Sequence, residues 1–146
     1  MTSVCPTDVR EFLHCRRLRL LIADREFTEE SALAGRLDNS VFKFCTFSEF
    51  SVSGKPVDAI FFNCAFVKID FYLTFFNICL FVDVCFENCT FRGVGFAECR
   101  FLNCKFVNCR FSEDDLGGKT TFDQSQWFAC KVENCVGLPW PEMERL

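Results

Sequence analysis

Phenylalanine recurs at every fifth residue through the middle of this chain, and few folds can accommodate that period. The unbroken series runs through eleven positions: Phe61, Phe66, Phe71, Phe76, Phe81, Phe86, Phe91, Phe96, Phe101, Phe106 and Phe111. On an α-helix, five steps rotate the side chain by about 140°, so the series would spread around the whole cylinder. On a straight strand, residues five apart point to opposite faces. The series can stay on one side of the backbone only if the chain turns a corner between successive phenylalanines.

The same register extends beyond this stretch in both directions. After the insertion "SEDDLGGKT" it resumes with Phe122, Trp127 and Val132. Upstream, with a break around "SGKPVD", we assign it to Ile22, Phe27, Ala32, Leu37, Phe42, Phe47 and Val52. A repeat that covers residues 22–137 determines the architecture of the chain before any other signal does.

The position two residues before each register residue lies on the same side of the chain. Nine of the twelve cysteines occupy it: Cys45, Cys64, Cys79, Cys89, Cys99, Cys104, Cys109, Cys130 and Cys135. Ala59, Ile69, Val84 and Val94 fill the same position elsewhere, so it favours small apolar residues rather than sulfur. Free cysteine behaves as a small buried hydrophobe. We therefore predict reduced thiols in a core instead of a secreted disulfide scaffold.

The position two residues after each register residue is the expected corner. In many of the repeats it holds a residue type that tolerates tight turns and left-handed backbone, namely Asn63, Asp83, Asn88, Gly93, Asn103 or Asn108. A chain that bends at each such corner winds into a solenoid whose coils stack at about 4.8 Å.

This unit, a small residue, a polar one, a large apolar one and two more, resembles that of the pentapeptide-repeat family. The match covers residues 22–137 and is most regular over 61–111. The resemblance implies an all-β fold, a right-handed quadrilateral β-helix with about 20 residues per coil. Roughly five coils would follow from the length of the repeat. This chain departs from the family pattern by placing Phe almost exclusively at the centre and Cys rather than Ala before it.

Three segments are predicted: an N-terminal helix or cap over 1–21, the β-helix over 22–137, and a C-terminal cap or tail over 138–146. Residues 6–20 have the pattern of a short helix with Thr7 as N-cap, which would cover the first coil. Trp140 lies between two prolines, so the final segment cannot continue the repeat. Some relatives form homodimers through an end of the solenoid, and the sequence leaves that alternative open.

Charge and hydropathy exclude several functional classes. The net charge is −4, and residues 40–135 carry nine basic and eleven acidic groups, so no stretch predicts direct nucleic-acid binding. No apolar run approaches the roughly 18 residues of a membrane span. The N-terminus lacks the order of a secretory signal, and we expect a cytoplasmic protein.

The sequence offers no constellation typical of catalysis. His14 is the single histidine, and it falls in the predicted helix. The cysteines are spaced by five or ten and directed inward, unlike the closely spaced ligands of a zinc site. We predict no metal, no cofactor and no enzymatic activity. Glu113, Asp114 and Asp115 are interpreted as a solvated loop, which could still carry binding function.

Outward positions in the coil over 62–85 are unusually apolar. The candidate partner-binding residues there are Phe62, Val67, Tyr72, Leu73, Phe75, Ile78 and Leu80, to which we add Glu113, Asp114 and Asp115 of the loop. Large apolar patches on a protein surface usually mark an interface. The N-terminal helix, which carries Phe12, Leu13, Leu18 and Leu20, could instead fold over this patch. Both alternatives stay open at this stage.

Three functions are compatible with such a rod. The resemblance implies either an immunity protein that neutralises a bacterial toxin or a DNA mimic that protects DNA gyrase. The inhibitor hypothesis predicts an apolar patch amid mixed charge, and the gyrase hypothesis predicts a continuous acidic face. A structural rod would use its patch only between copies of itself. The nearly neutral repeat favours the inhibitor, and a nuclease toxin with a basic groove would suit Glu113, Asp114 and Asp115.

Overall fold

Each five-residue unit folds as a short strand followed by a corner residue with left-handed backbone. The computed structural model describes residues 20–33 and 37–138. The predicted corner residues have positive φ, for example 52° at Asn63 and 57° at Asn88. Their amides remain in the ladder between turns, since Asn63 N–H donates to the carbonyl of Val82 at 2.9 Å. The corner every five residues is therefore confirmed.

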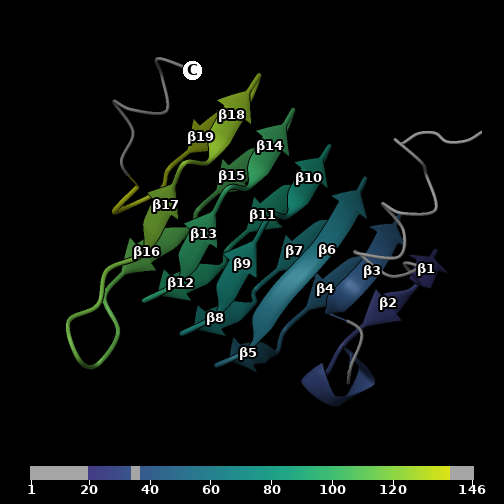
Figure 1. Ribbon diagram of the computed structural model, residues 1–146, viewed down its shortest axis with the longest axis horizontal. Coiled ribbons are helices and arrows are strands. Elements are labelled where there is room, and N and C mark those ends of the chain that lie inside the picture. The colour runs from purple at the N-terminus through teal and green to yellow at the C-terminus, as the bar shows by residue number, and fades with distance from the viewer. Residues whose placement is uncertain (1–19, 34–36, 139–146) are drawn as a thin grey trace, which may run out of the picture.

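The strands stack in parallel into the four faces of a solenoid (Figure 1). Face 1 consists of β1 (Leu20–Ala23), β3 (Asp38–Lys43), β6 (Pro56–Phe62), β10 (Leu80–Val82), β14 (Arg100–Leu102) and β18 (Gln126–Phe128). Face 2 consists of β2 (Glu26–Phe27), β4 (Thr46–Ser48), β7 (Ala65–Val67), β11 (Cys85–Glu87), β15 (Lys105–Val107) and β19 (Lys131–Glu133). Face 3 consists of β5 (Ser51–Ser53), β8 (Asp70–Tyr72), β12 (Thr90–Arg92) and β16 (Arg110–Ser112). Face 4 consists of the start of β6 with β9 (Phe75–Asn77), β13 (Gly95–Ala97) and β17 (Thr121–Asp123).

The predicted β-solenoid is thus confirmed. Register partners within the regular part are 20 residues apart, as in Phe61, Phe81 and Phe101.

The break around "SGKPVD" is a corner that the chain omits. Strand β6 runs straight for seven residues, pairing with β9 through Val57 and with β10 through Phe61. Val57 and Phe61 are both buried although they lie only four residues apart. One residue is therefore missing from this turn, and faces 4 and 1 become continuous through β6.

One register assignment in the first turn is wrong. Ala32 is exposed, and Leu33 is buried in its place. The cause is local: residues Glu30–Leu33 form the 3₁₀ helix η1 instead of a strand, which shifts the inward position by one.

The core is a set of stacked phenylalanine rings. Within a face, rings from successive turns stack in parallel, as in Phe81 and Phe101, whose centroids are 4.7 Å apart with planes 5° from parallel. Around a corner the rings meet edge to face, as in Phe81 and Phe86 at 5.6 Å and 61°. Both arrangements are favoured by the ring quadrupole. Phenylalanine therefore fills most of the large inward positions of the solenoid.

The small inward position has a chemical preference that the sequence analysis missed. Each buried thiol there lies within hydrogen-bonding distance of a carbonyl in the preceding turn, as Cys99 Sγ does with Phe76 O at 3.4 Å. Thr74 donates to Val52 O at 3.0 Å in the same way. Ser40 also occupies this position. A small hydrogen-bond donor fits better than an alanine because these carbonyls lie within reach. The ten cysteines of the described ranges are free thiols, as predicted.

The predicted helix over 6–20 lies outside the described residues, except that Leu20 opens strand β1. His14 and Trp140 also lie outside them. Within residues 20–33 and 37–138 there is no helix long and apolar enough to cross a membrane.

Candidate protein-binding surface

The apolar residues predicted as one patch are distributed over all four faces of the solenoid. Phe62 and Leu80 lie on face 1, and Val67 lies on face 2. The remaining four residues lie close together in the chain, on faces 3 and 4 and at the corners that follow these faces. Tyr72 lies on face 3, Leu73 at the corner, Phe75 on face 4 and Ile78 at the next corner.

The insertion after β16 projects from the corner between faces 3 and 4 (Figure 1). Its conformation is held by Asp114, whose Oδ1 accepts hydrogen bonds from the amides of Leu116 (2.7 Å) and Gly118 (2.9 Å). This side chain also occupies the space beside Gly93, where an added Cβ would lie 2.6 Å from Asp114 Oδ2. The carboxylate of Asp114 thus shapes the loop.

Asp115 ties the loop to face 3. Arg92 donates to its Oδ1 at 2.7 Å, and the guanidinium lies 4.8 Å from the centre of the Tyr72 ring. The amide of Asp115 donates to the Tyr72 hydroxyl at 3.3 Å. The hydrogen bond from Arg92, followed by that from Tyr72, lowers the pKa of Asp115. The sequence alone gave no signal for this arrangement, since its members are 20 or more residues apart.

The braced loop carries an apolar tip. Leu116 is 95% exposed, directly after the anchored Asp115. Leu73, Phe75 and Ile78 are 45%, 46% and 43% exposed on the same side of the solenoid. We call Tyr72, Leu73, Phe75, Ile78 and Leu116 the loop-side surface. The sequence analysis included the acidic residues of the loop and missed Leu116.

Two of these residues occupy corners that do not suit them. Leu73 has a φ of 53° and Ile78 a φ of 55°. A left-handed backbone costs an ordinary L-residue about 1–2 kcal/mol, and a β-branched side chain makes it an outlier. Corners after the other two faces are filled by Asn63, Asn88 and Asn103. The chain therefore exposes apolar side chains where a polar residue would be more stable.

A second apolar surface lies on face 1, and the sequence analysis missed its extent. It consists of two overlapping columns of register partners, Leu21, Val41, Ile60 and Leu80, then Phe62, Val82, Leu102 and Phe128. Both end residues are well exposed, Leu21 at 61% and Phe128 at 66%. We call this diagonal set the face-1 stripe.

Acidic and basic side chains are interspersed on the other faces. On face 2, Lys105 Nζ lies 3.6 Å from Glu133 Oε2, and Lys131 neighbours Lys105 in register. On face 3, Arg92 pairs with Asp115, and Arg110 follows Asp70 and Thr90 in the same column. Within the described ranges there is no continuous acidic face.

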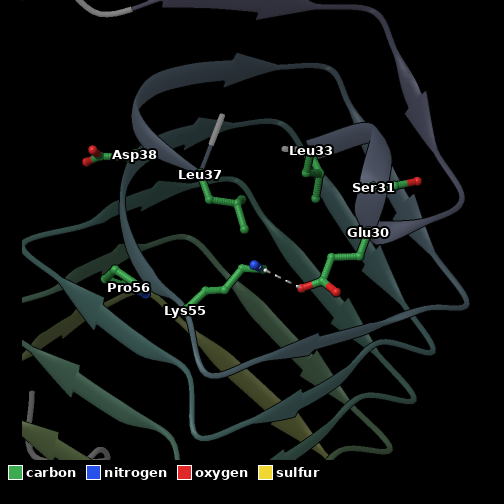
Figure 2. Close-up of a pocket in the computed structure, with 7 residues that line it drawn as sticks. All are labelled: Glu30, Ser31, Leu33, Leu37, Asp38, Lys55 and Pro56. Carbon is green, nitrogen blue, oxygen red and sulfur yellow. Dashed lines mark ion pairs between the residues drawn. The ribbon is translucent and has the colours of Figure 1, made fainter. Parts of the chain in front are cut away.

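A pocket of about 370 Å³ lies beside the first turn, lined by Glu30, Ser31, Leu33, Leu37, Asp38, Lys55 and Pro56 (Figure 2). Lys55 Nζ and Glu30 Oε2 face each other at 4.0 Å. Ser31 points away from this pair in Figure 2, and its hydroxyl donates to Glu29 at 3.0 Å. No group of metal-ligating side chains occurs in the described part of the chain.

No protein-family model and no curated protein sequence matches the chain. Among solved structures, it is similar to a pentapeptide repeat protein (Rfr23) from the cyanobacterium Cyanothece 51142. That match has 12% identity and a TM-score of 0.34, and covers 89% of this chain and 97% of the other. A second similar structure is QnrB1, a plasmid-mediated fluoroquinolone resistance protein, trypsin-treated and carrying R167E. There the identity is 11% and the TM-score 0.28, with 77% and 73% of the two chains covered.

At this level of similarity the neighbours carry no argument about partner or activity. The class of protein follows from this chain's own repeat and geometry: it is a four-sided parallel β-solenoid built on a five-residue repeat.

Proposed function

We propose that this chain is a non-enzymatic inhibitor that binds another protein through the loop-side surface. The observation that carries the proposal is the pair of exposed apolar residues, Leu73 and Ile78, held in left-handed corners. Surface positions that reduce stability commonly serve a function that needs them. An apolar surface on a rigid scaffold loses little conformational entropy on binding.

The braced loop supports the same proposal. Leu116 projects next to Asp115, which Arg92 and Tyr72 hold in place before any partner arrives. A pre-organised apolar residue surrounded by polar groups is typical of an interface anchor. The loop-side surface combines apolar residues with mixed charge, as the inhibitor hypothesis predicts.

For the partner, we propose a bacterial toxin, which makes the chain an immunity-type protein. A nuclease toxin is the narrower form of this hypothesis. Asp114 and Asp115 already bind groups of the loop and of face 3, so Glu113 would be the carboxylate that meets a basic groove. The gyrase alternative calls for a continuous acidic face, and the interspersed charges do not favour it.

A capture experiment from the native cytosol tests the proposal. The tagged chain is compared with Leu116→Asp and Ile78→Asp variants, and with Val107→Asp, an outward substitution on face 2, as control. We expect one stoichiometric partner with the wild type and the control, lost with both loop-side variants. The purified partner should be a toxin whose activity the chain blocks at one-to-one ratio. Capture of gyrase instead, or self-association alone, would overturn the proposal.

A further inference from the structure

We propose that Cys130 is a thiol-oxidation site, where a hydroperoxide oxidises the thiol and Cys104 then closes a disulfide between two successive turns. The two cysteines directly precede strands β15 and β19, which pair in register. The amide of Lys131 donates to the carbonyl of Cys104 at 3.0 Å, so the cysteines are neighbours in adjacent turns. The site lies inside the solenoid, away from the loop-side surface, and the inference does not rest on the proposed function.

The backbone spacing at this site suits a disulfide. Neighbouring strands lie about 4.8 Å apart, and the Cα atoms of a disulfide are about 4.4–6.8 Å apart. Each sulfur now lies 3.3 Å from a carbonyl of the preceding turn, Cys104 Sγ from Phe81 O and Cys130 Sγ from Phe101 O. Bond formation therefore requires one side chain to rotate about its Cα–Cβ bond. Cys130 is the better placed for this, because β19 is the terminal strand of its sheet within the described residues.

Cys130 is also more accessible to a dissolved oxidant than the stacked thiols of the middle turns. Its side chain is half-buried, whereas Cys104 is 2% exposed. Cys79 and Cys99 stack in the same way in earlier turns, but both are fully buried. An oxidant should therefore react at Cys130 before it reaches these thiols.

The neighbouring thiol makes Cys130 more nucleophilic. A hydrogen bond from Cys104 lowers the pKa of Cys130 to about 7, against the opposing effect of burial. The thiolate is the reactive form of cysteine. Cys135 provides a comparison within the last turn: it is half-buried as well and stacks on Cys109, yet burial raises its pKa. Of these two half-buried thiols, Cys130 should react first.

The reaction consumes one hydroperoxide, for which hydrogen peroxide is the simplest example. The Cys130 thiolate attacks one peroxide oxygen and the O–O bond breaks, which leaves a sulfenic acid on Cys130 and, after protonation, one water. The sulfur of Cys104 then attacks the sulfur of Cys130. The S–O bond breaks as the S–S bond forms, and the hydroxyl group leaves with the Cys104 proton as a second water. Two thiols lose two electrons, and the peroxide gains them.

Peptide mapping of the full-length chain tests the proposal. The reduced protein is treated with an equimolar amount of hydrogen peroxide near pH 7, the remaining thiols are alkylated, and the chain is digested with trypsin. Cys104 lies in fragment 101–105 and Cys130 in fragment 120–131, each with a single cysteine. We expect these two fragments to be joined, with the loss of two hydrogen atoms.

The second stacked pair in the last two turns is the matched control. Cys109 lies in fragment 106–110 and Cys135 in fragment 132–145. These fragments should become joined at least about tenfold more slowly, because the raised pKa leaves Cys135 with less thiolate. Equal rates for the two pairs would overturn the proposal. So would a disulfide at Cys130 that joins two copies of the chain, or recovery of alkylated Cys130 after other thiols have been oxidised.

A Cys104→Ser variant separates the two chemical steps. Serine already occupies the same inward position at Ser40, so the substitution keeps a small hydrogen-bond donor there. Oxidation of this variant should stop at the sulfenic acid of Cys130, which dimedone traps on fragment 120–131. The wild type should give much less of that adduct, and equal trapping would contradict the role of Cys104. The fragment rates are measured on the wild type, so they decide the proposal even if the variant does not fold.

Discussion

Arg92 and Asp115 form an ion pair of 2.7 Å that joins the projecting loop to face 3, and the ring of Tyr72 lies against the same guanidinium. The pair is solvent-exposed, and exposed pairs contribute little to global stability. Its effect is local, because it fixes the position of the residue just before the exposed Leu116.

The first prediction concerns release of this loop. Asp115→Asn removes the charge that Arg92 binds, so we expect the loop to detach from Tyr72 with little change in the urea midpoint. Tyr72 is the single tyrosine of the chain, so ¹³C-labelled tyrosine gives one ring signal that reports the contact. That signal should shift in Asp115→Asn and stay unchanged in Asp83→Asn, a corner carboxylate between faces 1 and 2.

The same contact should depend on pH in a defined direction. The pKa of Asp115 is lowered from 3.8 in the folded chain. The stabilisation that its carboxylate gives to the contact between the loop and face 3 is therefore complete above pH 3.8. It is lost as the pH falls through the lowered value. The tyrosine signal of the wild type should therefore move only in strongly acidic solution, and the movement should be absent in Asp115→Asn. A transition near neutral pH would contradict this assignment.

The second prediction concerns the left-handed corner at Ile78. Replacing Ile78 by Asn relieves a conformational cost of about 1 kcal/mol or more, which offsets the apolar contacts that are lost. Val107→Asn removes a comparable outward side chain from an extended position, where the substitution relieves no backbone strain. We expect Ile78→Asn to be at least about 1 kcal/mol more stable than Val107→Asn in urea unfolding. Partner capture should show the opposite order.

How far the sequence determines this fold is clear from particular residues. The inward Phe and the corner Asn residues were predictable because the relevant interactions are local. A corner every five residues places each successive phenylalanine on the inner side of the chain. Leu33 could not be assigned from the pattern, since η1 changes the rise per residue only in the first turn. The binding surfaces were harder to predict from the sequence than the core. Val82 and Leu102 are adjacent in space because a turn holds 20 residues, and a reading along the chain groups residues by turn, not by face.

The third prediction tests the stacked core. Phe91 is fully buried and lies between the rings of Phe71 and Phe111, at centroid distances of 5.0 and 4.6 Å. Phe91→Ala should destabilise the chain by about 3–5 kcal/mol, because a rigid stack cannot close the cavity. Phe44→Ala serves as the matched control, since Phe44 is 55% exposed, and it should cost less than about 1 kcal/mol. Equal losses for the two variants would mean that the rings do not form the core.

The last prediction concerns alkaline pH. Burial raises the pKa of the Cys64 thiol from 9.0 to about 11, so the folded chain keeps it protonated where the unfolded chain does not. A raised pKa means that the stabilisation is complete below pH 9 and is lost as the pH rises towards 11. In that interval Cys64 alone should cost the folded state about 1.4 kcal/mol per pH unit.

Urea midpoints measured from pH 8 to pH 10.5 should therefore fall, and Cys64→Ala should flatten part of the decline. Other groups also titrate there, so the difference between the two curves reports Cys64 together with its interaction with the neighbouring thiol of Cys45. Parallel curves would place Cys64 in water rather than in the core.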